Sequence, residues 1–191
     1  MHFAAKRSII VPAPNGYFLY CITTVMIVKK ISAREGLFSM LTNYHTHTTR
    51  CGHAEGTEEE YILTALRCGY KVLGFSDHTP WAYATPGFVS HIRMLPAQLD
   101  DYVLTLRSLR EKYADRLHLH IGLEAEYFPA YLGWLKEETE RLGIEYLILG
   151  CHYDTTDEQD AKARRFGGSA SPAHGRRYAE QVERALETGL Y

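Results

Sequence analysis

The sequence lacks the short motifs that mark several large enzyme classes. It has no glycine-rich phosphate loop, no serine nucleophile elbow and no Gly-x-Gly-x-x-Gly dinucleotide fingerprint. These absences argue against a P-loop nucleotidase, a serine hydrolase and a dinucleotide-dependent oxidoreductase.

A large charge of one sign and paired cysteines are also missing. The formal net charge is -2 and the basic residues form no block, which disfavours a nucleic-acid surface built on phosphate contacts. The four cysteines, Cys21, Cys51, Cys68 and Cys151, include no Cys-x-x-Cys pair, and a disulfide framework is unusual in a chain of 191 residues. We therefore predict a reduced, cytoplasmic protein.

The sequence has the amino-acid composition of an ordinary soluble domain, and it is rich in histidine. Hydrophobic residues make up 46% of the chain and charged residues 23%, and the length is sufficient for one domain with its own core. Ten histidines are present, and their positions are more informative than their number.

The first 39 residues differ from the rest. No charged residue occurs from Ser8 to Val28, and basic residues flank this stretch on both sides. Its uninterrupted part, Tyr17 to Val28, is too short for a helix that spans about 30 Å of hydrocarbon. Three interpretations stay open: an extension upstream of a natural start at Met40, a loosely packed arm, and a membrane anchor. We favour the extension, expect membrane attachment to be absent, and place the folded domain at residues 40–191.

From Met40 onward, strand patterns alternate with helix patterns. Thr57 and Glu60 form the signature of a capping box, which predicts the start of a helix that stops at Gly69. Apolar residues at helical spacing predict further helices. The first runs from near Pro96 to beyond Leu109, the second from near Pro129 to Gly143, and the third from near Pro172 to Gly189. Strands are predicted at residues 72–76, 117–123 and 146–149. Alternating strands and helices predict parallel β-α units.

Each predicted strand ends in a residue that can bind a metal ion. His45 and His47 come first, followed by His78, Glu124 and His152 at three successive strand ends. The carboxyl ends of parallel strands lie at one edge of a sheet, where ligands gather. The pattern therefore favours a barrel with a metal centre at its mouth.

The residue types at these positions suit metal-dependent hydrolysis. Two histidines two apart in an extended segment point to one face, and a carboxylate can bridge two ions. We prefer Glu124 for the bridging role and treat Glu126 as its rival; Asp77 is expected to orient an imidazole. Histidines mixed with carboxylates favour zinc, manganese or iron over calcium or magnesium. His53, in the loop that follows His47, is a further candidate ligand.

Other polar residues receive weaker assignments. His118 and His120 are interpreted as structural, and His91 and His174 receive no role. Cys51 and Cys151 flank predicted ligands, but without closer pairing they are treated as neutral neighbours. Arg50 and Arg93 are candidate phosphate-binding residues because they are basic and lie near the motifs.

Four segments together resemble the polymerase-and-histidinol-phosphatase (PHP) superfamily, in particular its histidinol-phosphatase branch. They are Asn43-Tyr44-His45-Thr46-His47 with Cys51-Gly52-His53, then Ser76-Asp77-His78-Thr79-Pro80, Gly122-Leu123-Glu124-Ala125-Glu126-Tyr127 and Gly150-Cys151-His152-Tyr153. The match covers residues 41–191, and its specificity comes from the combination.

The resemblance implies a fold, a ligand set and a reaction. The implied fold is a distorted (β/α)7-type TIM-like barrel, with fewer strands than the usual eight. His45, His47 and Glu124 would hold one ion, Glu124 and His152 a second, and His53 and His78 would belong to a third. Glu124, His78 and Asp77 would be the catalytic residues. The implied reaction is the hydrolysis of L-histidinol phosphate to L-histidinol and phosphate, in histidine biosynthesis.

The chain departs from the family pattern at its end. Family members continue with a further strand ending in a histidine and a late Asp-x-His pair, whereas this sequence ends at Tyr191. We therefore expect a barrel truncated at its C-terminal end. The alternatives are a PHP phosphoesterase acting on another substrate such as nucleic-acid ends, a metal amidohydrolase, and a non-catalytic metal-binding fragment. The oligomeric state stays open.

Overall fold

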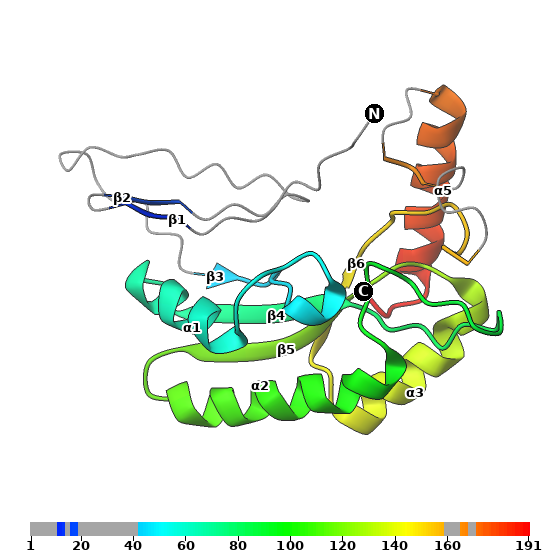
Figure 1. Ribbon diagram of the computed structural model, residues 1–191. Helices are drawn as coiled ribbons and strands as arrows, with labels where there is room; N and C mark the ends of the chain where they lie inside the picture. The colour runs from blue at the N-terminus through cyan, green and yellow to red at the C-terminus, as the bar shows by residue number, and fades with distance from the viewer. Residues whose placement is uncertain (1–10, 14–15, 19–41, 159–164, 168–170) are drawn as a thin grey trace.

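The computed structural model describes residues 11–13, 16–18, 42–158, 165–167 and 171–191. Its main feature is a parallel sheet of four strands in the order β3-β4-β5-β6 (Figure 1). These strands are β3 (Thr42–Asn43), β4 (Val72–His78), β5 (His118–Ala125) and β6 (Tyr146–Leu149). Two short strands, β1 (Val11–Ala13) and β2 (Gly16–Phe18), form a separate antiparallel pair. Most of the predicted extension at residues 1–39 lies outside the described residues.

Helices connect the strands as the sequence predicted. They are α1 (Glu58–Arg67), α2 (Leu99–Tyr113), α3 (Leu132–Leu142) and α5 (Pro172–Glu187), with short 3-10 turns η1 (Thr49–Cys51), η2 (Pro96–Gln98) and η3 (Pro129–Tyr131). In Figure 1, α2 and α3 lie below the sheet, and α5 stands at the right-hand end. Each parallel strand pair is therefore joined by a helical crossover, as parallel pairing requires.

The capping box predicted for the first helix is confirmed. The Thr57 hydroxyl accepts the Glu60 N–H over 3.2 Å, and the Glu60 carboxylate accepts the Thr57 N–H over 2.7 Å. Two otherwise unpaired donors of the first turn are thereby satisfied. Ile62 and Ala65 are buried on the side of α1 that faces the core. Gly69, at a φ of 83°, follows the helix end as expected.

The other helix predictions are confirmed in position, and the structure adds detail to them. The segments that begin at Pro96 and Pro129 start as 3-10 turns before α2 and α3 continue, and Gly143 ends α3 in a left-handed conformation. The last helix begins at Pro172 as predicted. Two of the apolar residues that it carries, Tyr178 and Leu186, are nevertheless 46% and 57% exposed, because α5 packs through a narrower face.

Two strands extend further than predicted. β4 continues to His78, and β5 continues to Ala125. Glu124 therefore lies inside β5, in register with His78 of β4, and Glu126 is the first residue beyond the strand. The predicted end of the strand at Glu124 is thus one residue short. The reason is that Ala125 pairs with Leu149 of β6, so the β5–β6 pairing extends the strand past the apolar run that marks it in the sequence.

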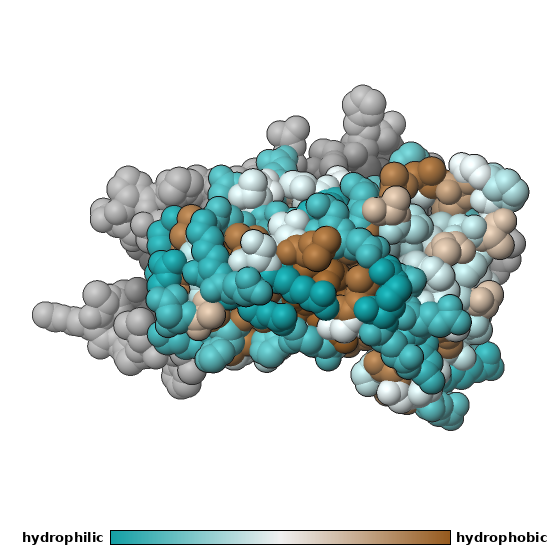
Figure 2. Space-filling view, turned by 90° about the horizontal axis from the view of Figure 1, so that it is seen from below, coloured by the Kyte–Doolittle hydropathy of each residue, from teal (hydrophilic) through white to brown (hydrophobic). Residues whose placement is uncertain are grey.

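The architecture is an α/β fold with a curled, four-stranded parallel half-barrel sheet. The core lies between the sheet and its helices, where Phe75, Tyr102, Leu106 and Ile121 are almost completely buried. Figure 2, seen from below, shows a largely hydrophilic outer surface around a central apolar area. Among the described helices, none is long and apolar enough to cross a membrane.

Candidate metal centre

The carboxyl edge of the sheet gathers the residues that the sequence placed at the strand ends. His45 and His47 follow β3 in an extended segment. His78 is the last residue of β4, in register with Glu124 of β5, and His152 lies just beyond β6. Residues from across the chain therefore meet at one place, as expected for the ends of parallel strands.

A backbone hydrogen bond holds the first pair of histidines against the sheet. The Ser76 N–H of β4 donates to the Thr46 carbonyl over 2.9 Å, so the segment after β3 continues alongside β4. Alternation then directs His45 and His47 to one face. Their Nε2 atoms lie 3.1 Å apart, which brings two potential ligand atoms together.

Glu124 is the centre of the arrangement. Its Oε2 atom lies 3.1 Å from His45 Nε2, 3.2 Å from His47 Nε2 and 3.2 Å from His78 Nδ1. Its Oε1 atom lies 3.3 Å from His152 Nε2. The carboxylate is only 3% exposed, so four imidazoles surround it in place of water.

His53 joins this cluster from the turn that follows η1. Its ring centroid lies 4.9 Å from that of His47 and 5.1 Å from that of His78. We define the histidine cluster as His45, His47, His53, His78 and His152 around Glu124. All six were predicted from the sequence as ligands, and the structure places them together.

Burial and mutual contact shift the titration of these groups. Burial raises the pKa of Glu124, but His45, His47 and their neighbours outweigh it and hold that pKa well below its usual value. Burial also lowers the pKa of His78 well below normal, so this imidazole is neutral near pH 7. For His47, contacts with Asp77, Cys51 and Glu124 overcome burial and raise the pKa to about 12. A cation at Glu124 would compete with that proton.

Unsatisfied atoms show that the cluster suits a metal ion. Buried polar atoms normally have a hydrogen-bond partner. His47 Nδ1, His78 Nδ1 and Glu124 Oε2 have polar neighbours within 3.4 Å, yet none of these contacts has the geometry of a hydrogen bond. Imidazole nitrogen and carboxylate oxygen are the donor set preferred by zinc and by manganese or iron. Three groups have ligand atoms within 4.8 Å of one another: His45 with His47 and Glu124, His78 with Glu126 and His152, and His47 with Cys51 and His53.

Asp77 lies behind the cluster, and its contacts fit the predicted orienting role. It is fully buried, and its carboxylate accepts the Thr48 N–H over 3.0 Å and also the Thr48 hydroxyl. Its Oδ1 atom lies 3.4 Å from Nδ1 of His47. A fixed carboxylate at this distance biases the orientation and charge of the ring.

Arg93 and Glu126 form a buried ionic network instead of an open site. The guanidinium donates to both oxygens of Glu126, over 2.7 and 2.6 Å, and to Asp157 over 3.1 Å. Trp81 donates a further hydrogen bond of 3.3 Å to Glu126. Burial raises the pKa of Glu126, but the Arg93 guanidinium outweighs this effect and lowers the pKa to about 2. The predicted phosphate partner Arg93 is therefore already paired, and the sequence did not reveal this network.

Arg50, the second predicted phosphate partner, binds carboxylates of two helices. It donates to Glu58 of α1, and to Asp101 of α2 over 2.7 Å. The guanidinium thus ties the turn after the first histidines to the helices. The structure does not bring it into the histidine cluster.

The remaining histidines and cysteines have ordinary surroundings. His118 is exposed, and His120 contacts Glu145 over 2.6 Å at the surface. Among the described cysteines, Cys51, Cys68 and Cys151 are free thiols. Cys51 differs from the others because it is fully buried beside His53.

A tyrosine that the sequence analysis overlooked supports the base of the cluster. Tyr146 of β6 lies across the face of the sheet, and its hydroxyl contacts the Tyr44 carbonyl at 2.7 Å and the Phe75 carbonyl at 3.0 Å. A Cβ at Gly122 would lie 2.5 Å from the ring, and one at Gly74 would overlap its hydroxyl. These glycines are therefore required so that the ring can reach the residue just before His45.

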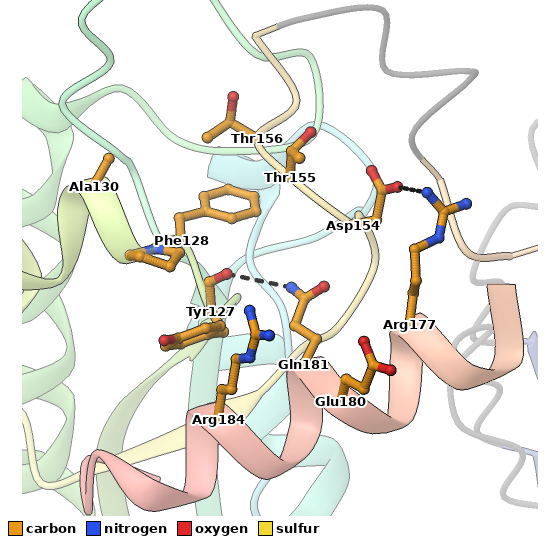
Figure 3. Close-up of a pocket in the computed structure, with 11 residues that line it drawn as sticks. Tyr127, Phe128, Ala130, Asp154, Thr155, Thr156, Arg177, Glu180, Gln181 and Arg184 are labelled. Atoms are coloured by element: carbon orange, nitrogen blue, oxygen red, sulfur yellow. Dashed lines mark hydrogen bonds and ion pairs between the residues drawn. The ribbon is translucent and has the colours of Figure 1, made fainter. Parts of the chain in front are cut away.

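A cavity lies beside the carboxyl edge, between the loops after β5 and β6 and helix α5 (Figure 3). Its volume is about 420 Å³. Gln181 of α5 donates to the Tyr127 carbonyl over 3.2 Å, and Arg177 pairs with Asp154 over 2.9 Å. Arg184 also lines it and forms no ion pair with any described residue. Tyr127 and Asp154 follow Glu126 and His152 closely in the chain, so the cavity adjoins the cluster.

The fold and the site define a class: an α/β half-barrel whose carboxyl edge gathers imidazoles and a carboxylate in the manner of a metal centre. Within that class, a family profile described as "PHP domain" matches residues 43–186. The chain belongs to the PHP domain family, as its motifs predicted.

Two curated relatives have names that state an activity. A protein of Deinococcus radiodurans named "Probable histidinol-phosphatase" is 34% identical over 116 residues, which are 59% of this chain and 42% of that protein. A protein of Schizosaccharomyces pombe with the same name is 29% identical over 115 residues, 57% of this chain and 38% of that protein. The chain therefore spans about two fifths of the length of these relatives.

A solved structure supports the fold. The crystal structure of hisK from Listeria monocytogenes, described as a candidate histidinol phosphatase, aligns with 72% of this chain and 51% of its own. The TM-score is 0.53 and the sequence identity is 21%. At this identity, the similarity shows a common fold and nothing further.

Proposed function

We propose that the chain provides the metal-binding part of a phosphomonoester hydrolase of the histidinol-phosphatase type. The reaction would be L-histidinol phosphate and water to L-histidinol and phosphate, in L-histidine biosynthesis. The observation that carries the proposal is the buried Glu124 carboxylate with four imidazole nitrogens within 3.3 Å. The names of the two curated relatives support the choice of substrate.

The cluster would hold two or three divalent ions of zinc, manganese or iron. His45 and His47 with Glu124 form the group best suited to the first ion, and His152 reaches the other oxygen of the same carboxylate. His53 and His78 are the proposed ligands of a third. When bound, such ions supply positive charge for the phosphate oxygens and lower the pKa of an attacking water.

The protein's own groups would set the geometry and the protonation of this site. Glu124 remains ionised, because the surrounding imidazoles lower its pKa. His78 remains neutral, because burial lowers its pKa, and a neutral imidazole can act as a metal ligand. Asp77 would act through His47 as a positioning residue. Arg50 and Arg93 are weaker candidates for phosphate binding, since carboxylates pair with both.

The cavity beside α5 is a candidate for the part of the substrate that does not react. Its lining combines the aromatic Tyr127 and Phe128 with the polar Gln181 and with Arg184. Such a mixture suits a small phosphorylated ligand with a ring and a polar group. We further propose that residues 40–191 form one domain. This domain would be part of a distorted (β/α)7-type barrel, and the protein would act in the cytoplasm.

Two other functions stay possible for the same site. A PHP phosphoesterase acting on nucleic-acid ends would use the same ions, but the net charge of -2 gives little attraction for a polyanion. The other is a non-catalytic metal-binding role, in which the histidine cluster would hold ions without hydrolysing a phosphate ester.

The test is phosphate release from L-histidinol phosphate by the purified chain with added manganese. His47→Ala, prepared in the same way, provides the blank. Turnover above the blank supports the proposal. Metal binding without turnover selects the non-catalytic alternative, and turnover of a nucleotide 3′- or 5′-phosphate but not of histidinol phosphate selects the other phosphoesterase.

A further inference from the structure

The turn after the first histidines brings a thiol to the edge of the cluster. Thr49–Cys51 forms η1, and Gly52 then turns the chain with a φ of 74°. The Cys51 sulfur, fully buried, lies 3.6 Å from Nε2 of His53. Two ligand types that bind zinc strongly are thus adjacent.

The backbone fixes His53 in the form that binds metal ions. Its Nδ1 lies 3.1 Å from the Cys51 carbonyl, which can only accept, so Nδ1 bears the proton and donates. The lone pair is therefore on Nε2, the atom that faces the sulfur. A metal-binding imidazole commonly donates a hydrogen bond from its other ring nitrogen to a backbone carbonyl, which fixes the orientation of the ring.

His47 offers a third ligand atom on the side away from Glu124. Its Nε2 faces Glu124, whereas its buried Nδ1 faces the Asp77 carboxylate at 3.4 Å without a hydrogen bond of good geometry. The side chain is only 6% exposed, and the ring is in contact with the Cys51 thiol. Ligand atoms of His47, Cys51 and His53 lie within 4.8 Å of one another. Asp77, 3.4 Å from Nδ1, adds negative charge beside them.

We propose that Cys51 Sγ, His53 Nε2 and His47 Nδ1 form a thiolate-containing metal site that takes a thiophilic divalent ion such as zinc. It adjoins the Glu124 site and rests on the proposed function. Its ion would take the place of the third ion proposed above, with Cys51 and His47 instead of His78 as the partners of His53. On binding, the Cys51 S–H bond breaks, its proton leaves to solvent, and the sulfur lone pair forms the bond to the ion. Simultaneous occupation of both sites makes His47 a bridging imidazolate, which loses its second ring proton as well.

A competing role for the thiol follows from one contact. Cys51 Sγ donates to the Thr48 carbonyl over 2.9 Å, as a buried thiol that only completes η1 would do. Metal binding removes that hydrogen bond. The two roles therefore differ in a property that can be observed directly, the presence of a sulfur–metal bond.

Cobalt(II) titration of the metal-free full chain tests the proposal, because thiolate–cobalt bonds give a near-ultraviolet charge-transfer band. The wild type should show this band together with visible d–d bands, and Cys51→Ser should lose the charge-transfer band and bind one fewer zinc per chain. Cys151→Ser is the matched control, since it removes the half-buried thiol next to His152, and it should keep the band.

Other outcomes overturn the proposal. Visible bands without charge transfer in the wild type would exclude the thiolate ligand and leave the Glu124 site and the proposed function intact. A band that persists in Cys51→Ser would assign the sulfur to another cysteine. Absence of any cobalt binding would overturn both this site and the metal centre. Cadmium NMR of the wild type needs no substitution, and a resonance without the downfield shift of sulfur ligation would also contradict the proposal.

Discussion

Glu124 and Glu126 lie two residues apart on the same strand end, yet their surroundings are opposite. Both are buried, at 3% and 0% exposure. Arg93 and Trp81 satisfy both oxygens of Glu126, whereas Glu124 keeps an oxygen without a hydrogen-bond partner among imidazoles.

This contrast separates a structural carboxylate from one available to a ligand. A buried carboxylate requires compensation for its charge. Glu126 has it in a guanidinium that keeps its protons, whereas Glu124 has it in imidazoles such as His47, whose proton a metal ion can replace. His152 contacts both carboxylates, over 3.3 Å to Glu124 and 2.9 Å to Glu126, and so links the two regions.

Removal of the guanidinium should give the largest effect. Arg93→Met leaves the carboxylates of Glu126 and Asp157 buried without their cation, and breaking a buried pair in this way costs about 3–5 kcal/mol. Urea unfolding of the metal-free chain measures the loss. Arg116→Met, at an exposed arginine, is the control and should change the free energy of unfolding by less than about 0.5 kcal/mol. A loss below about 1 kcal/mol for Arg93→Met would erase the distinction between the two carboxylates.

The isosteric substitution of Glu124 should weaken metal binding more than it lowers the free energy of unfolding. Glu124→Gln removes the negative charge that four imidazoles surround, and we expect zinc affinity to fall by at least about 100-fold. Competition with a chelating dye measures the affinity. Urea unfolding of the metal-free protein should show a smaller loss than Arg93→Met does, because the amide keeps an oxygen beside the imidazoles and Asp77 remains beside His47. Zinc binding within about threefold of the wild type would refute the role of Glu124.

A smaller effect is expected behind the cluster. Asp77→Asn keeps an acceptor for the Thr48 N–H but removes the charge that lies 3.4 Å from His47, and zinc affinity should fall by about 10-fold. The same competition assay applies. Asp101→Asn, at an exposed carboxylate, provides the control, and an equal loss in both variants would show that only net charge matters.

The smallest effect is expected at Arg50. Its ion pairs with Glu58 and Asp101 lie outside the histidine cluster, so Arg50→Met should lower the free energy of unfolding by no more than about 1 kcal/mol. If the phosphatase activity is present, KM should stay within about twofold. A large rise in KM with unchanged stability would restore Arg50 as a phosphate-binding residue.

The sequence predicted the position of the cluster because strand ends in a parallel sheet share one edge. The apolar runs Val72–Ser76 and Tyr146–Leu149 predict parallel strands, and the polar residues that follow such strands lie at the same edge of the sheet. The capping box at Thr57 and the left-handed Gly143 were equally predictable, since each depends on neighbouring residues alone.

Contacts between distant loops could not be predicted in this way. Arg93 and Asp157 are 64 residues apart in segments without periodicity, so no local pattern indicates their ion pair. Tyr146 reaches Tyr44 across two intervening strands, and that contact depends on the missing side chains of Gly74 and Gly122. The end of β5 also escaped prediction, because pairing with β6 extends this strand to Ala125.

Anomalous diffraction from crystals grown with zinc tests the central claim most directly. The account predicts zinc bonded to Nε2 of His45 and His47 and to an oxygen of Glu124, at about 2.0–2.2 Å. A fully occupied zinc elsewhere on the chain, with no anomalous density among these three residues, would contradict it.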